Sequence, residues 1–236
     1  MFESDFPLAV IIPAAGVGKR MRSNCPKQYL KINGKTILEH TVERILSHPS
    51  IDLAVIALSA DDEYYKTTAL PQNPKVATVI GGEERVDSVL AGLKSIDTSK
   101  YSWALVHDAA RPCVSIEDLS NLITECFQKD CGGILASPVR DTMKRAKRDL
   151  FIAKTECRDN LWHALTPQMY PVGQLIQSIE KAIEEGLEIT DESSAIELAN
   201  FPSLLVEGSN HNLKVTHPSD LMLAELILGA QPINNT

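Results

Sequence analysis

The stretch Leu8-Ala9-Val10-Ile11-Ile12-Pro13-Ala14-Ala15-Gly16-Val17-Gly18-Lys19-Arg20 decides the fold of this 236-residue chain. Its apolar beginning has the length and composition of a strand buried on both faces of a sheet. The strand then opens into small residues followed by cations. Small residues let the main chain approach a ligand closely, and backbone N–H groups beside cations favour phosphate. The stretch therefore predicts an α/β protein that binds a phosphate-bearing ligand such as a nucleoside triphosphate.

Two well-known phosphate-binding patterns do not fit this glycine-rich turn. It lacks the spacer and the hydroxyl residue of a Walker A loop, and Met21 stands where a dinucleotide fingerprint has its third glycine. Taken alone, the turn is also compatible with solvated basic residues at the end of a strand. Lys27 favours the binding interpretation, because Pro26 fixes the backbone ahead of it and would help to aim its charge.

The composition excludes several classes of protein. A net charge of −8 argues against a nonspecific nucleic-acid binder, which would be basic overall. The chain holds five cysteines, an odd number without a CxxC pair, which favours reduced thiols in the cytoplasm. No apolar run approaches the length of about 18 residues that a membrane span needs, and the acidic N-terminus is unlike a signal peptide. We therefore expect a cytoplasmic protein that binds neither nucleic acid nor membrane.

Apolar runs of strand length alternate along the chain with segments of helical period. The runs cover 8–12, 53–58, 76–80 and 102–106, and their composition is typical of strands buried on both faces. Helical spacing of apolar residues follows at 38–46, 86–93, 119–127, 175–183 and 218–228, with a further helix after Asp191. This order predicts a mostly parallel, twisted sheet whose ligand lies beyond the carboxyl ends of the strands.

The alternation breaks at 139–155, a segment rich in Lys and Arg with little helical period. Two extended pieces joined by Lys147-Arg148-Asp149 predict a projecting β-arm. We expect residues 1–138 and 156–236 to form one α/β domain that carries this arm. Because a lone two-stranded hairpin is barely stable in water, we expect the arm to pack on a second copy of the chain, giving a homodimer.

Two loops that follow predicted strands carry candidate site residues. Asp108, in His107-Asp108-Ala109-Ala110-Arg111-Pro112, is well placed to hold Mg²⁺ together with substrate phosphate, although a helix N-cap would also explain it. The pair Gly81-Gly82 would let main-chain atoms lie against a base or a ribose. The acidic residues after it are also favourable at the start of any helix, so this second motif is weak alone.

A third group of residues is scattered in sequence but suited to a phosphate monoester. Lys214 lies in Asn212-Leu213-Lys214-Val215-Thr216, a strand-like piece whose apolar residues point away from the lysine. Cations and hydroxyls that converge from distant segments bind phosphate well, whereas any one of them alone is more usually solvated. The other members of the group are Arg140, Thr142, Lys144, Arg145, Arg158 and Thr166.

Several motifs recur together in the order of a known family. They include Pro13-Ala14-Ala15-Gly16, Pro26-Lys27-Gln28, Gly81-Gly82-x-x-Arg85, His107 to Pro112, Arg140-Asp141-Thr142, Leu165-Thr166-Pro167-Gln168, Thr190-Asp191-Glu192 and Lys214-Val215-Thr216. Through them the chain resembles the 2-C-methyl-D-erythritol 4-phosphate cytidylyltransferases of non-mevalonate isoprenoid biosynthesis, from about residue 8 to residue 228. The resemblance implies a Rossmann-like nucleotidyltransferase fold. It also implies an Mg²⁺-dependent reaction of CTP with methylerythritol phosphate that gives the CDP-alcohol and pyrophosphate.

The resemblance also implies a role for each matching residue. Arg20 and Lys27 would neutralise the triphosphate and the transition state, Arg158 and Lys214 would be catalytic through the second phosphate, and Asp108 would hold Mg²⁺. The CTP-binding residues would be Pro13, Ala14, Ala15, Gly16, Gly82, Glu83, Ser88 and Ala109. The residues for the sugar-alcohol phosphate would be Arg111, Thr142, Thr166, Thr190 and Asp191, and the arm would carry Thr142 and Lys144 to the partner's site.

Two other functions are compatible with parts of the sequence. A cytidylyltransferase acting on ribitol 5-phosphate or a similar pentitol phosphate would share the nucleotide half, so residues 139–168 and Lys214 have to discriminate between the substrates. A nonenzymatic nucleotide sensor on the same fold would be expected to lose Lys27 or Asp108, and both are present.

Overall fold

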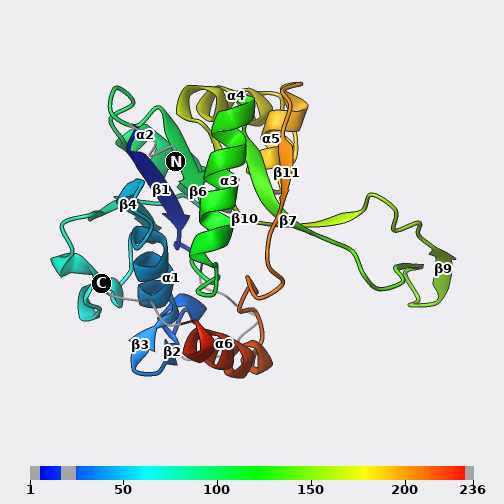
Figure 1. Ribbon diagram of the computed structural model, residues 1–236, viewed down its shortest axis with the longest axis horizontal. Coiled ribbons are helices and arrows are strands. Elements are labelled where there is room, and N and C mark those ends of the chain that lie inside the picture. The colour runs from blue at the N-terminus through cyan, green and yellow to red at the C-terminus, as the bar shows by residue number, and fades with distance from the viewer. Residues whose placement is uncertain (1–5, 17–24, 232–236) are drawn as a thin grey trace.

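The computed structural model describes residues 6–16 and 25–231. Seven strands form its main sheet in the order β11-β7-β10-β6-β1-β4-β5 (Figure 1). Only β10 runs antiparallel to its neighbours, which confirms the predicted mostly parallel sheet. The strands are β1 (Leu8–Pro13), β4 (Ile51–Leu58), β5 (Val76–Ile80), β6 (Trp103–Val106), β7 (Gly133–Pro138), β10 (Trp162–Pro171) and β11 (Leu204–Glu207).

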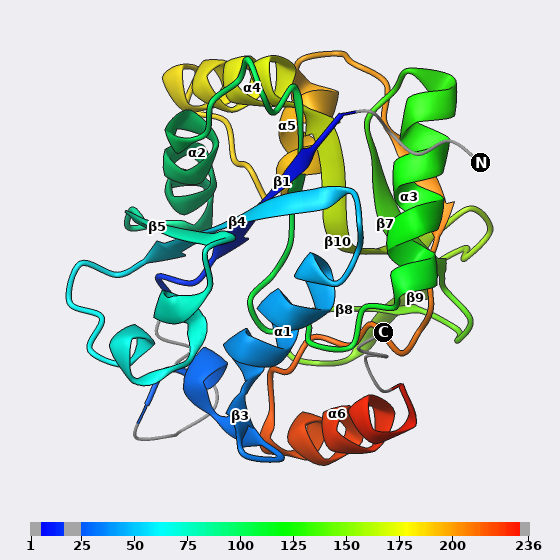
Figure 2. The same cartoon turned by 60° about the vertical axis from the view of Figure 1, so that its left-hand side comes forward.

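Helices cover both faces of this sheet because its central strands are apolar on both faces. In β1, Val10 packs with α1 and α3 on one face, whereas Ile11 packs with α2, α4 and α5 on the other (Figure 2). The helices of the first face are α1 (Ile37–Leu46) and α3 (Ile116–Lys129). Those of the second are α2 (Arg85–Ser95), α4 (Val172–Glu184) and α5 (Glu192–Leu198).

A third, smaller apolar cluster lies beyond the carboxyl ends of the parallel strands. Helix α6 (Pro218–Ala230) packs there beside β2 (Lys31–Ile32) and β3 (Lys35–Thr36) through Ile32, Val215 and Ala224. The 3-10 helix η2 (Lys27–Tyr29) leads into this cluster, and two more 3-10 helices, η3 (Tyr65–Thr67) and η4 (Leu70–Gln72), lie between β4 and β5. These elements wall the edge of the sheet at which β1, β4 and β6 end.

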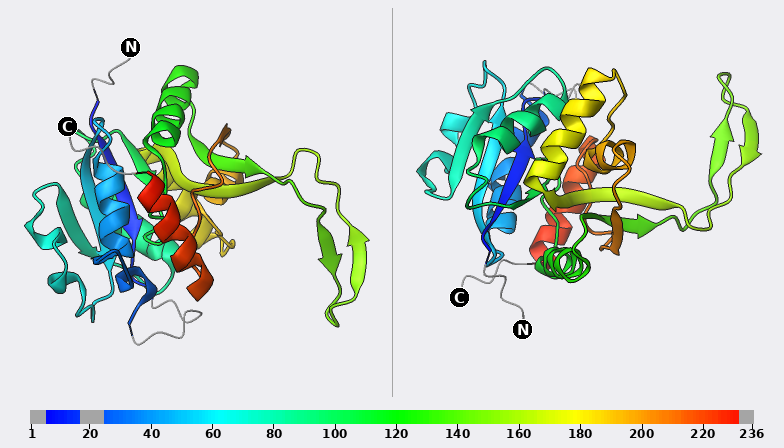
Figure 3. Two further views of the ribbon diagram at one scale, coloured as in Figure 1. Left: turned by 60° about the horizontal axis from the view of Figure 1, so that its bottom comes forward. Right: turned by 90° about the horizontal axis from the view of Figure 1, so that it is seen from above.

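Strands β8 (Lys144–Ala146) and β9 (Ile152–Thr155) form a separate two-stranded sheet between β7 and β10. Figure 3 shows this hairpin standing well away from the rest of the molecule. All residues of both strands are exposed, and so are Leu150 and Phe151 between them. Its stem is closed where the Val139 N–H donates to the Leu161 carbonyl, at 2.9 Å.

Three details of the sheet differ from the sequence expectation. Strand β5 was expected to be buried on both faces, but it is an edge strand whose last residue, Ile80, is 70 % exposed. The strand-like piece at 212–216 is an extended loop, joined to the body by the Val215 N–H, which donates to the Ala110 carbonyl at 2.8 Å. Strand β10 was not predicted, because its polar and proline-containing sequence lacks the apolar pattern of its neighbours.

Across the described ranges, no helix is both long enough and apolar enough to cross a membrane. Within the same ranges, no disulfide joins any of the five cysteines.

Candidate active site

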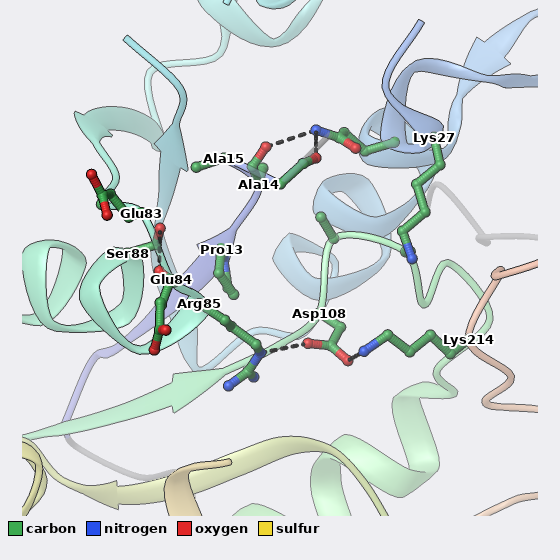
Figure 4. A pocket seen from close by; sticks show the side chains of 15 residues that line it. Pro13, Ala14, Ala15, Lys27, Glu83, Glu84, Arg85, Ser88, Asp108 and Lys214 are labelled. Carbon is green, nitrogen blue, oxygen red and sulfur yellow. Dashed lines mark hydrogen bonds and ion pairs between the residues drawn. The ribbon is translucent and has the colours of Figure 1, made fainter. Parts of the chain in front are cut away.

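A pocket opens at the carboxyl ends of β1, β5 and β6, where the sequence places the ligand (Figure 4). It brings together four of the predicted motifs and the distant Lys214. The lining residues are Pro13, Ala14, Ala15, Gly16, Lys27, Gln28, Gly82, Glu83, Glu84, Arg85, Ser88, Asp108, Ala109, Ala110 and Lys214. One side of the pocket is thus mainly backbone and small side chains, whereas the other carries charge. Arg20 lies outside the described residues.

The backbone wall depends on two glycines that no larger residue could replace without a shift. A Cβ on Gly81 would lie 2.5 Å from Ser88 Oγ and 2.9 Å from the Ala15 Cβ, and one on Gly82 would lie 2.2 Å from the Asp87 Cβ. The loop after β5 therefore lies directly against the start of α2 and against the glycine-rich turn. This close approach is what brings Ser88 and Ala15, both predicted to bind CTP, to the same pocket wall.

Gln28 braces the end of the first strand. Its side chain is buried, and its amide donates to the Ala14 carbonyl at 2.7 Å and to the Gly16 carbonyl at 3.2 Å. These two hydrogen bonds satisfy the carbonyl groups of Ala14 and Gly16 and fix the backbone of the turn. Gln28 stands beside Lys27 in the sequence, but no local signal there predicts this role.

Lys27 approaches the same pocket from η2. Its Nζ lies 3.1 Å from the Val215 carbonyl, to which it donates, and Figure 4 shows it directed toward the space beside Asp108. The helix that carries it is anchored by Tyr29, whose hydroxyl donates to Asp62 Oδ2 at 2.6 Å. The predicted aiming of Lys27 thus relies on η2 and its contacts as well as on Pro26.

Three cations surround the buried carboxylate of Asp108. Lys214 Nζ lies 2.8 Å from Oδ2 and Arg85 Nε lies 3.1 Å from Oδ1, while Arg111 Nε lies 3.5 Å from Oδ2. Burial raises the pKa of Asp108, but Arg85, Lys214 and Arg111 outweigh burial and hold that pKa well below its ordinary value. Asp108 is therefore a permanent anion at the centre of a cationic site.

Arg85 is shared between Asp108 and a second buried carboxylate, Glu192 at the start of α5. Arg85 Nη1 and Nη2 donate to Glu192 Oε1 and Oε2 at 2.6 and 3.1 Å. Burial raises the pKa of Glu192, and the charge of Arg85 opposes that rise. Neither residue was predicted as a site residue, although each lies inside a quoted motif; only the fold brings these motifs together.

A chain of hydrogen bonds fixes the loop that carries Asp108. The Asp108 N–H donates to Thr166 Oγ1 at 3.1 Å, and Thr166 Oγ1 lies 3.0 Å from His107 Nδ1. His107 Nε2 lies 3.0 Å from the Arg111 carbonyl, which can only accept. Nε2 therefore carries the proton, and Nδ1 accepts from the threonine hydroxyl. Burial lowers the pKa of His107 to about 4, so the imidazole is neutral near pH 7.

The predicted phosphate-binding residues other than Lys214 fall into three groups. Arg111 and Thr166 contact Asp108 or its backbone, as described above. The N-cap of α5 is Asp191, which accepts from the Ser194 N–H and from Gln168, and the exposed Thr190 precedes it. Thr142 and Arg158 are exposed on the excursion between β7 and β10, where Arg158 donates to the Arg140 carbonyl, and neither lines the pocket.

The donor set at Asp108 fits a magnesium ion that is held largely by its ligand. Mg²⁺ is commonly bound through one or two carboxylates, with phosphate oxygens and water completing its coordination. Asp108 offers one carboxylate, whose two oxygens face Arg85 and Lys214 in this structure, beside cations suited to phosphate. Among the residues that the structure describes, no cluster of three or more His, Cys, Asp or Glu could hold a metal by itself.

The neutral state of His107 leads to a prediction about stability. Because its folded-state pKa of about 4 lies below the unfolded value of about 6.5, the unfolded chain binds the extra proton between these values. The contribution of neutral His107 to the free energy of unfolding is fully present above about pH 6.5, and it is lost as the pH falls toward 4. We expect urea unfolding to show a loss from this residue of about 2 kcal/mol between about pH 7.5 and about pH 5.

The comparison that isolates this loss uses two histidine variants. His107→Gln should lose less stability over this pH range than the unsubstituted protein, whereas His163→Gln, at an exposed position on β10, should follow the unsubstituted protein. Equal pH dependence in all three proteins would contradict the assigned neutral imidazole.

Similar proteins confirm the resemblance that the motifs indicate. Residues 8–230 match the family described as IspD: 2-C-methyl-D-erythritol 4-phosphate cytidylyltransferase. Proteins with that name from Colwellia psychrerythraea and Vibrio vulnificus are 57 % and 51 % identical. The first match covers 99 % of both chains and the second covers 98 % of both.

The fold agrees with solved structures of the same family. A crystal structure of the Francisella tularensis 2-C-methyl-D-erythritol 4-phosphate cytidylyltransferase superposes with a TM-score of 0.81 at 37 % identity, covering 94 % of this chain and 100 % of that one. The enzyme from Thermus thermophilus superposes with a TM-score of 0.79 at 28 % identity, covering 94 % and 98 %. The chain therefore belongs to the 2-C-methyl-D-erythritol 4-phosphate cytidylyltransferase family.

Proposed function

We propose that this chain is a nucleotidyltransferase that condenses CTP with 2-C-methyl-D-erythritol 4-phosphate in non-mevalonate isoprenoid biosynthesis. The observation that carries the proposal is the pocket itself. It joins a wall of backbone and small side chains at Ala14, Ala15 and Gly82 to the cations around Asp108. Such a wall suits a nucleoside, and the cations suit the phosphates of two anionic substrates.

The reaction needs electrostatic help more than proton transfer. An ionised oxygen of the methylerythritol phosphate attacks the α-phosphorus of CTP and forms the new P–O bond. The bond from the α-phosphorus to the bridging oxygen breaks, and its electron pair leaves with pyrophosphate. Because the nucleophile is a phosphate monoester that is already ionised near pH 7, no general base is required. His107 is accordingly a neutral, fully buried residue that fixes a loop.

We assign the nucleotide to the backbone wall. The proposed CTP contacts are Pro13, Ala14, Ala15, Gly16, Gly82, Glu83, Ser88 and Ala109, all of which line the pocket. A pocket wall that Gly81 and Gly82 bring so close leaves little room, which favours a pyrimidine over a larger purine. Glu83 and Gly82 are exposed at the rim, whereas Ser88 is buried behind them.

The charged side of the pocket is assigned to the phosphates and to Mg²⁺. Asp108 would hold the ion, which when bound would neutralise part of the triphosphate charge. Lys27 and Lys214 direct their ammonium groups toward the same region and would stabilise the charge that grows in the transition state (Figure 4). Arg20 is proposed to act with Lys27 from the segment that precedes η2.

The sugar-alcohol phosphate is assigned to Arg111, Thr166, Thr190, Asp191 and Lys214, together with Thr142 and Arg158. Thr142 and Arg158 lie on the projecting excursion and away from the pocket of their own protomer. We therefore propose a homodimer in which residues 139–155 of each chain reach the partner, so that Thr142 and Lys144 serve its site. The exposed apolar residues Leu150, Phe151 and Ile152 support this proposal, because water solvates them poorly.

We propose that the enzyme works in the cytoplasm, where thiols stay reduced. Its five cysteines form no disulfide within the described residues, and Cys113 and Cys126 are buried in apolar clusters as reduced side chains.

A direct assay tests the proposed substrates. The purified protein, CTP and Mg²⁺ should release pyrophosphate with 2-C-methyl-D-erythritol 4-phosphate and should give 4-diphosphocytidyl-2-C-methyl-D-erythritol. Ribitol 5-phosphate and ATP, offered separately in place of either substrate, should be turned over far more slowly. Faster turnover of ribitol 5-phosphate would contradict the assignment and would identify the protein as a pentitol-phosphate enzyme.

Removing one preorganised cation tests the electrostatic mechanism. Lys27→Met keeps much of the side-chain volume but loses the charge, and we expect kcat to fall by about 10²-fold or more. Lys31→Met, at an exposed position of β2, is the matched control and should leave kcat unchanged. A near-normal kcat for Lys27→Met would argue against a role for Lys27 in the transition state.

Sedimentation equilibrium tests the arm. We expect a dimer at micromolar concentration, and we expect Phe151→Asp at the exposed tip to shift the equilibrium toward the monomer without changing the far-ultraviolet circular dichroism. Ile80→Asp places the same charge at another exposed apolar residue and should leave the dimer intact. A monomer whose mass does not change with concentration would refute the dimer.

A further inference from the structure

The guanidinium of Arg85 divides its donors between two buried carboxylates. Its two terminal nitrogens bind the oxygens of Glu192 at 2.6 and 3.1 Å, whereas only Nε reaches Asp108, at 3.1 Å from Oδ1. Because Arg85 binds only one oxygen of Asp108, the other oxygen is left for a different cation. The second oxygen, Oδ2, faces Lys214 at 2.8 Å.

Glu192 is held rigidly in the position from which it binds Arg85. Its side chain is 2 % exposed, and it is the first residue of α5. Gln168 on β10 accepts from the Ser193 N–H at 2.8 Å and donates to Asp191 Oδ2 at 2.9 Å. The residues on either side of Glu192 are therefore bonded to β10 of the central sheet, which fixes the backbone from which the Glu192 carboxylate extends.

The planar fork of an arginine binds carboxylate oxygens in pairs, and here two carboxylates lie within reach of one fork. Without Glu192, the terminal nitrogens of Arg85 would be free to turn toward Asp108 and occupy both of its oxygens. That arrangement would displace Lys214 and any other cation from Oδ2. The pairing with both terminal nitrogens of Arg85 is what stabilises the charge of Glu192 at this buried position.

We propose that Glu192 is a positioning residue of the transfer reaction, which acts by holding the fork of Arg85 away from Asp108. The inference rests on the proposed function and adds to it a residue that does not line the pocket. It implies that Glu192 matters for the arrangement of charge at Asp108 and much less for binding of the cytidine, which we assign to the backbone of Ala14, Ala15 and Gly82.

A double-mutant cycle tests this role. Glu192→Gln keeps the size of the side chain but removes its charge, and we expect kcat to fall by about 10- to 100-fold, as for residues that orient a ligand-bearing group. The KM for CTP should change by less than about threefold. Arg85→Lys removes the fork but keeps the charge. In the Arg85→Lys background, Glu192→Gln should have little further effect, because there is no fork left to hold.

The matched control is Glu197→Gln, which makes the same change at an exposed position of α5 and should leave kcat unchanged. A merely structural role for Glu192 predicts a different pattern. Glu192→Gln would then lower kcat by the same factor in both backgrounds, or would raise the KM for CTP as much as it lowered kcat. Either result would overturn the proposal.

A spectroscopic measurement keeps the inference separate from the proposed function. The Nε–H signal of Arg85 in a proton–nitrogen correlation spectrum, assigned by its loss in Arg85→Lys, should shift in Glu192→Gln and stay in place in Glu197→Gln. An unchanged signal in Glu192→Gln would overturn the proposal. If the unsubstituted protein fails to join CTP to methylerythritol phosphate, the proposed function fails, while the spectrum still shows whether Glu192 sets the geometry of Arg85.

Should Glu192→Gln fail to fold, Glu192→Asp supplies the same test with the charge retained. Its carboxylate is one methylene shorter and can no longer bind both terminal nitrogens in the observed geometry. We expect a smaller fall in kcat and a shift of the same Nε–H signal, and an unchanged kcat together with an unchanged signal would overturn the proposal.

Discussion

The buried carboxylate of Asp108 is the constraint on which the rest of the site depends. Arg85, Arg111 and Lys214 reach it from the start of α2, from the loop after β6 and from the segment before α6. An unpaired charge at this depth would cost several kcal/mol. Moving any one of these cations away from Asp108 is therefore unfavourable, and the ion pairs fix the positions of both partners. Segments more than 100 residues apart in sequence are thereby fixed to one point.

The order of the strands explains how these segments meet. Strands β1 and β6 lie side by side and are parallel, so the glycine-rich turn and the Asp108 loop emerge at the same edge. The antiparallel β10 lies on the other side of β6 and brings Thr166 to the Asp108 backbone. An additional parallel strand at this position would end at the pocket edge, whereas β10 enters from it and so can carry residues from the arm into the core.

The sequence was most informative where a signal is local. The glycine-rich turn, Gly82 and Asp108 each follow an apolar run, and parallel strands ending at one edge were enough to predict that they meet. The roles of Gln28, Arg85 and Glu192 could not be predicted in this way. Their hydrogen-bond partners lie 12 to 107 residues away in the sequence, and only the folded chain brings the side chains together. The exposure of β5 could not be predicted from local sequence either. Its apolar composition resembles that of the central strands, and only the strand order places it at the edge of the sheet.

The charge balance around Asp108 explains why the site favours two anions over one. Lys27, Arg85, Arg111 and Lys214 bring four positive charges to the region, where Asp108 and Glu192 lie between them, and Glu83 and Glu84 line the part of the pocket nearer the nucleotide wall. Like charges held together by a rigid scaffold repel each other, and this repulsion is relieved when phosphates arrive. A triphosphate and a phosphate monoester repel each other in water, but in the proposed reaction each would be attracted to the same fixed cations. The energy of folding, which holds the cations in place beforehand, thus supports the approach of two anions that would otherwise stay apart.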